Sequence, residues 1–155
     1  MSEQAPPPAS VAELNKRLSE IQAQLKAVVG KIEAGRILES FDTLSRVTDA
    51  IVTNCESLGL AAEKPVFEGF DRISFWRALN HCWIFALKHT DAATSEVQRL
   101  HEEHLLHLQE SIEKWCDVLQ KYGLVDYEMG FWELDIMDAL NAVHNQVKRR
   151  QESQE

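Results

Sequence analysis

Apolar residues recur every three or four positions along most of the chain, and this period predicts α-helices. The first stripe is narrow, because its steps between residues 11 and 32 alternate strictly between three and four. A stripe this narrow is typical of a coiled coil, whereas the helix of a globular domain usually presents a broader apolar face. The capping-box pattern Ser10-Val11-Ala12-Glu13 predicts that the helix begins at Ser10. The seam that we expect to contact a partner helix consists of Val11, Leu14, Leu18, Ile21, Leu25, Val28 and Ile32.

A second stripe follows Gly35 in a different register. The break leaves two structures open: one long helix kinked near Gly30 and Gly35, or a helical hairpin that turns at Gly35. We favour the long helix, because no good N-cap residue directly follows Gly35. Gly59 followed by Leu60 predicts a Schellman-type end of this segment. The second stripe consists of Ile37, Phe41, Leu44, Thr48, Ile51, Cys55 and Leu58.

Three more helices are predicted after a connector that contains the only interior proline, Pro65. Asp71 is the expected N-cap of the first and Asp91 of the second, while Gly123 is the expected stop of the second. The last has a clear amphipathic period that begins near Trp132. The expected ranges are 72–89, 92–122 and 131–148.

These elements predict an all-α fold in which an N-terminal coiled-coil helix precedes a small three-helix bundle. If the chain instead turns at Gly35, the arm folds back on the bundle and gives a compact array of four or five helices. The expected organisation is a disordered leader at 1–9, an arm at 10–59, a connector at 60–70, a bundle at 71–148 and a flexible tail at 149–155.

Charge and composition narrow the possible functions. The chain has 155 residues, with 16 Lys plus Arg against 25 Asp plus Glu, and its net charge of -9 argues against nonspecific binding to nucleic acid. It has no run of about 18 apolar residues, so we predict no membrane-spanning helix. Three widely spaced cysteines, Cys55, Cys82 and Cys116, are an odd number and are typical of reduced thiols. We therefore predict an intracellular protein of the cytoplasm or nucleus.

The histidines of His101-Glu102-Glu103-His104 superficially resemble those of a zinc-protease helix. That motif places its histidines four residues apart, whereas these are three apart, and the glutamates project away from them. We therefore expect structural or solvent-facing histidines and no cofactor. The alternative is a metal site that His101 and His104 complete with His81 or Cys82 from a neighbouring helix.

Aromatic residues concentrate around the connector and the helix after it. Six of the twelve lie between Phe67 and Phe85, which indicates first of all a packed core. Because Trp and Phe are also favoured in interfaces, the outermost of these rings are candidates for contact with a partner. These candidates are Phe67, Phe70 and Phe85.

The sequence thus predicts a non-enzymatic adaptor or subunit of a larger complex that assembles through its N-terminal coiled coil. The seam has no Asn or Lys to set its own register, which favours a different protein as the partner over a second copy. The alternative hypothesis is a helical-bundle domain, possibly an enzyme, that binds a metal or ligand through His81, Cys82, His101 and His104.

Overall fold

The computed structural model describes residues 8–60, 71–126 and 130–154, and it contains five α-helices and no strand within these ranges. The predicted all-α class is confirmed. Short 3-10 turns at Thr90–Ala92 and Glu96–Gln98 separate the third and fourth helices. The α-helices are α1 (Pro8–Glu33), α2 (Ile37–Thr53), α3 (Arg72–Lys88), α4 (Glu102–Gln120) and α5 (Glu133–Gln154).

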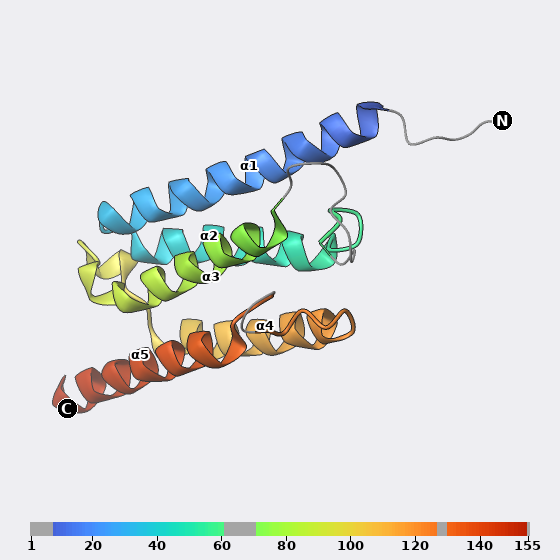
Figure 1. Cartoon of the computed structure of the whole chain (residues 1–155). Helices are drawn as coiled ribbons and strands as arrows, with labels where there is room; N and C mark the ends of the chain where they lie inside the picture. The colour runs from blue at the N-terminus through green and yellow to red at the C-terminus, as the bar shows by residue number, and fades with distance from the viewer. Residues whose placement is uncertain (1–7, 61–70, 127–129, 155) are drawn as a thin grey trace.

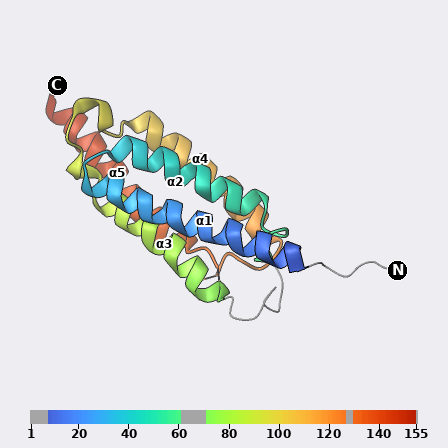
Figure 2. The same ribbon diagram turned by 90° about the horizontal axis from the view of Figure 1, so that it is seen from above.

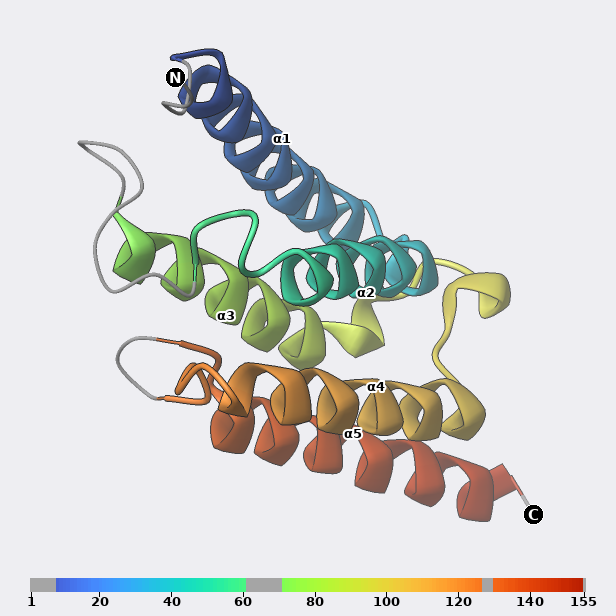
Figure 3. The same cartoon turned by 90° about the vertical axis from the view of Figure 1, so that its right-hand side faces the viewer.

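The helices form three layers, with α1 above α2 and α3, and with α4 and α5 below them (Figure 1). Successive helices run in alternating directions, so α1 and α3 run the same way. Seen from above, α1 lies between α2 and α3 (Figure 2). In the third view α2 and α3 separate α1 from α4 and α5 (Figure 3). Because α2 packs against both α3 and α4, the predicted arm and bundle share one hydrophobic core instead of standing apart.

The segment expected to be one long helix is a hairpin. Gly35 has a φ of +81°, its N–H donates to the Ile32 carbonyl (3.0 Å), and the Arg36 N–H donates to the Lys31 carbonyl (2.9 Å). These two bonds are the Schellman pattern, which needs a left-handed residue. The chain therefore reverses after Glu33, and α2 packs back on α1.

The physical reason for this error lies far away in the sequence. No side chain near Gly35 caps α2, but the Glu39 N–H donates to Oε1 of Gln98 at 3.1 Å. The Thr94 N–H also donates to the Gly35 carbonyl at 3.2 Å. A segment about 60 residues later thus supplies the partners that the local sequence lacks, which no search for a local N-cap can detect.

The predicted helix 92–122 begins ten residues later than expected, at Glu102. The residues before it form the turns that cap the hairpin, and Val97 in these turns is 76% exposed. The start of α4 is closed by a bond from the His101 N–H to Nδ1 of His104 (2.9 Å). The last helix extends past its expected end at 148 to Gln154.

The predicted boundaries at Asp71 and Gly123 are confirmed, whereas α2 ends at Thr53, before the expected stop at Gly59. Gly59 and Gly123 have φ values of +75° and +69°, and Leu60 N–H and Leu124 N–H each reach back five residues, to the carbonyls of Cys55 and Leu119. Asp71 caps α3 as expected, because its Oδ1 accepts from the Ser74 N–H at 3.1 Å.

Three buried or half-buried polar side chains tie the lower helices together. Asn80 on α3 is fully buried, donates to the Gly130 carbonyl (2.8 Å) and accepts from the Trp132 N–H (3.0 Å). Trp83 Nε1 donates to Oγ1 of Thr48 at 3.0 Å. Trp115 Nε1 donates to Oδ1 of Asp49 at 3.2 Å. These bonds fix α3 against α2 and the start of α5, and α4 against α2.

Candidate functional site

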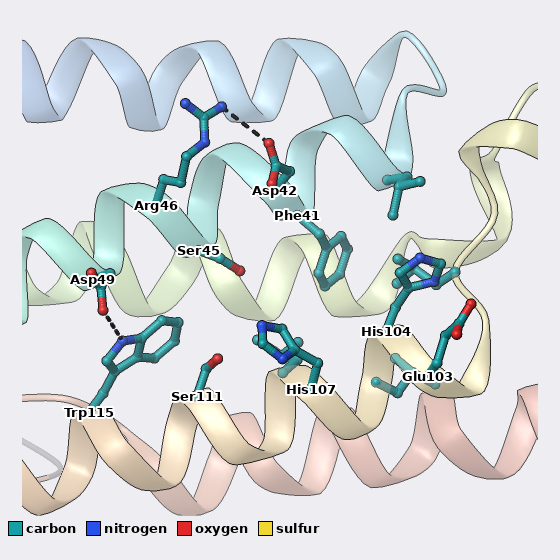
Figure 4. A pocket seen from close by; sticks show the side chains of 14 residues that line it. Phe41, Asp42, Ser45, Arg46, Asp49, Glu103, His104, His107, Ser111 and Trp115 are labelled. Atoms are coloured by element: carbon teal, nitrogen blue, oxygen red, sulfur yellow. Dashed lines mark hydrogen bonds and ion pairs between the residues drawn. The ribbon is translucent and has the colours of Figure 1, made fainter.

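Two open grooves run between helices, and the first lies between α2 and α4 (Figure 4). It has a volume of about 630 Å³, and its side chains are chemically mixed. Its polar and aromatic residues are Phe41, Asp42, Ser45, Arg46 and Asp49 from α2 and Glu103, His104, His107, Ser111 and Trp115 from α4.

Most of the charged and titratable groups of this groove have partners within the chain. Asp42 pairs with Arg46 at 3.3 Å, and Asp49 accepts from the Trp115 indole. Nδ1 of His104 is occupied by the His101 backbone N–H. Among the described residues no hydrogen bond joins a serine of this groove to a histidine.

The second groove lies between α1 and α3 and is larger, with a volume of about 830 Å³. The side chains of Ser19, Ala23 and Ala78 are too small to fill the space between the two helices. The floor of the groove is formed by the buried side chains of Leu25 and Cys82. The remaining lining residues are Gln22, Lys26, Val29, His81, Ile84, Phe85, Lys88 and His89.

The charges of this second groove all have one sign. Lys26 stands on α1 and Lys88 on α3, with His81 and His89 beside them, and no Asp or Glu among the described residues lines the groove. Neither lysine forms an ion pair with any residue that the structure describes. In a chain of net charge -9, this groove is a local basic surface with an apolar floor.

The three thiols are buried and poorly suited to nucleophilic chemistry. Burial raises the pKa of Cys82 and of Cys116 to about 12 and that of Cys55 to about 11. At neutral pH the thiolate, which is the reactive form, is therefore scarce at all three. The Cys82 thiol instead donates weakly to the Leu25 carbonyl, with a sulfur–oxygen distance of 3.8 Å, and so joins α3 to α1.

The residues of the predicted coiled-coil seam differ in how deeply they are buried. Four members are buried within this chain: Leu18, Leu25, Val28 and Ile32. Leu14 and Ile21 are half-buried, and Val11 is 38% exposed. The apolar stripe that was expected to need a partner is thus largely covered by the chain's own α2 and α3.

The aromatic candidates are placed only in part. Phe67 and Phe70 lie outside the described residues. Phe85 is half-buried at the rim of the α1–α3 groove, with its ring 4.1 Å from that of His89. Nδ1 of His89 also lies 2.7 Å from the Phe85 carbonyl oxygen, which fixes the imidazole beside the ring.

The alternative metal site is not assembled. His81 and Cys82 line the α1–α3 groove, His104 lines the α2–α4 groove, and His101 is exposed ahead of α4. Across residues 8–60, 71–126 and 130–154, no three His, Cys, Asp or Glu side chains are grouped so that they could hold a metal ion. His101 and His104 instead close the start of α4, where the His101 N–H donates to Nδ1 of His104.

Of the groove residues, the sequence predicted Leu25 and Phe85 as partner contacts and His81 and Cys82 as candidate ligands, but Lys26, Lys88 and the small residues were missed. The available signal was the spacing of Ser19, Gln22, Ala23 and Lys26, which places small and basic residues along one flank of the seam. These residues can be recognised as the wall of a groove only when α3 is known to lie beside them.

Comparison of the chain with protein-family models, with curated proteins and with solved structures finds no match in any of the three. Among the described helices, none has a stretch both long and apolar enough to pass through a lipid bilayer.

Proposed function

We propose that this protein is a non-enzymatic helical subunit of a hetero-complex, and that it binds a helix of another protein in the α1–α3 groove. The observation that carries the proposal is an apolar floor lined by small residues between two helices of the same direction. An amphipathic helix lays its apolar stripe into such a groove, which is a recurring mode of recognition between proteins.

The shape of the groove favours a helix over a small molecule. A small-molecule site typically buries most of its ligand on several sides. Of the part of the chain that the structure describes, α1, α3 and the residue after α3 contribute the side chains of the groove, which is open along its outer side. A third helix laid over them buries a continuous apolar stripe, as α1 itself does over α2 and α3.

The groove replaces most of the coiled-coil seam as the proposed contact. Leu18, Val28 and Ile32 already pack inside the chain, so their burial needs no partner. The prediction that a partner protein contacts Val11, Leu14 and Ile21 still applies to the N-terminal part of α1. The alternative of a metal- or ligand-binding site needs His81, Cys82, His101 and His104 at one place, whereas His81 and Cys82 line the α1–α3 groove and His104 lines the α2–α4 groove.

Site-specific photo-crosslinking in the native cells tests this proposal. A photoreactive phenylalanine analogue replaces Ala23 or Ala78, which are exposed lining residues, and Ala142, which is exposed on α5, is the matched control. We expect the same protein to be captured from both groove positions and not from position 142. Capture of nothing from either groove position, or equal capture from position 142, contradicts the proposal.

A further inference from the structure

We infer that the partner helix is acidic: its apolar stripe is flanked by Asp or Glu side chains that meet the basic walls of the α1–α3 groove. This inference rests on the proposed function, because it names the chemistry of the occupant of the same groove. It starts from the signs of the charges that line the two walls.

The basic residues stand on both sides of the apolar floor. Lys26 belongs to the α1 wall, and His81, Lys88 and His89 belong to the α3 wall. A helix laid along the floor therefore has a cation on either flank. The lining spans residues 19–29 of α1, which is about 15 Å of helix, so about three turns of partner helix fit along it.

The rest of the chain makes this basic lining informative. Acidic residues outnumber Lys plus Arg by 25 to 16 in the full sequence, yet none of those in the described ranges lines this groove. The α2–α4 groove, by contrast, has Asp42, Asp49 and Glu103 in its lining. Because salt screens charges beyond about 8–10 Å, the partner experiences the local lining more strongly than the net charge of the chain.

The lysines are also free to act on a partner. Both are exposed, and within the described ranges neither is held in an ion pair. Carboxylates on a docked helix gain charge-assisted hydrogen bonds to them, which set orientation and exclude basic partners. An anionic membrane fits less well, because a flat lipid surface does not reach a floor recessed between two helices and is repelled by a chain of net charge -9.

Charge reversal with a matched control tests the inference. The groove variant is Lys26→Glu with Lys88→Glu, and the control is Lys114→Glu with Lys121→Glu. Both change the net charge equally, and both place one substitution at the C-terminal end of a helix, α3 or α4. All four lysines are exposed, so both variants are expected to fold, which circular dichroism checks.

The measurement is the crosslink yield from position 78 in the full-length chain, with the captured segment identified by mass spectrometry. We expect an amphipathic segment with Asp or Glu beside its apolar stripe. The groove variant should lower the yield at least tenfold, and the control should lower it less than twofold. A captured segment without flanking acidic residues, or equal yields from both variants, overturns the inference.

The two proposals fail in different ways. If the unaltered chain captures nothing from positions 23 and 78, the proposed function is wrong. If capture is specific to the groove but indifferent to charge, only the acidic partner is wrong. Sedimentation with vesicles of phosphatidylserine and phosphatidylcholine gives the remaining outcome: binding that the groove variant abolishes identifies a lipid surface and overturns the acidic helix, whereas no binding supports it.

Discussion

The two grooves differ in how the facing helices are tied together. Between α2 and α4, Trp115 bonds to Asp49, and the charges of Asp42 and Arg46 neutralise each other. Between α1 and α3, the only polar contact across the helices in the described part of the chain is the weak Cys82 thiol bond. The first groove is satisfied internally, whereas the second keeps unpaired cations above an apolar floor.

This difference indicates that the α2–α4 contacts stabilise the fold, whereas the α1–α3 groove has side chains available to bind a partner. A polar group that already has a partner contributes little to binding, because the existing bond must be broken first. Unpaired cations beside apolar surface are available at no such cost. The lower helices α2 to α5 are therefore expected to depend on specific polar bonds for stability, and α1 on apolar packing and on its turn.

The largest expected effect is at the polar tie between α3 and the start of α5. Asn80→Ala leaves the Gly130 carbonyl and the Trp132 N–H without their buried partner, so we expect unfolding to become easier by about 3 kcal/mol. Urea denaturation measures this loss. Asn141→Ala, on the exposed face of α5, is the control and should change stability by less than about 0.5 kcal/mol. A loss below about 1 kcal/mol for Asn80→Ala contradicts the structural role.

The turn that attaches α1 gives the next effect. Gly35→Ala places a Cβ at a positive φ and against the side chain of Thr94, so we expect a loss of about 2 kcal/mol. Gly30→Ala has open space in the last turn of α1 and should stabilise the protein by about 0.5–1 kcal/mol. A melting temperature that falls for Gly35→Ala and rises for Gly30→Ala supports the hairpin. A long kinked helix predicts that both substitutions stabilise it.

The alkaline pH dependence isolates the thiol between α1 and α3. Burial raises the pKa of Cys82 from its ordinary value of 9.0 to about 12. The unfolded chain therefore loses this proton first, so stability is full below pH 9 and falls as pH rises towards 12. At pH 10, deprotonation of Cys82 in the unfolded chain lowers the free energy of unfolding by about 1 kcal/mol.

The measurement compares urea denaturation at pH 8 and pH 10 for the unaltered chain and for Cys82→Ala. We expect the alkaline loss of stability to shrink by about 1 kcal/mol in the variant, whatever the variant costs at pH 8. Equal alkaline losses in the two proteins contradict the burial of the thiol proton.

The helices themselves were predictable, because their apolar periods and glycine stops are local signals. Gly123 ends α4 by the Schellman bonds that a glycine followed by an apolar residue indicates, and Gly59 makes the same bonds in the turns that follow α2. Gly35 has the same bonds, but the choice between kink and hairpin depended on Gln98 and Thr94, about 60 residues away. Remote caps of this kind leave no trace in a local pattern.

The groove was less predictable for a related reason. Its floor joins Leu25 to Cys82, which are 57 residues apart. The seam shows that one side of α1 is covered, but it does not show whether α2, α3 or another protein covers it. Lys26 and Lys88 therefore appear in the sequence as ordinary surface lysines, and only their juxtaposition gives them a shared environment.

The smallest expected effect compares two buried indoles of α3, one tied and one not. Trp83 Nε1 bonds to Thr48, whereas Trp76 Nε1 is buried and has no hydrogen-bond partner among the residues that the structure describes. Trp83→Phe leaves the Thr48 hydroxyl without its donor and should lower the free energy of unfolding by about 1–2 kcal/mol.

Trp76→Phe removes an unsatisfied N–H together with some packing, and these effects on stability oppose each other. We therefore expect a net change below about 0.5 kcal/mol for Trp76→Phe in urea denaturation. Equal losses for the two variants contradict the view that stability in this part of the core comes from specific polar bonds as well as from ring burial.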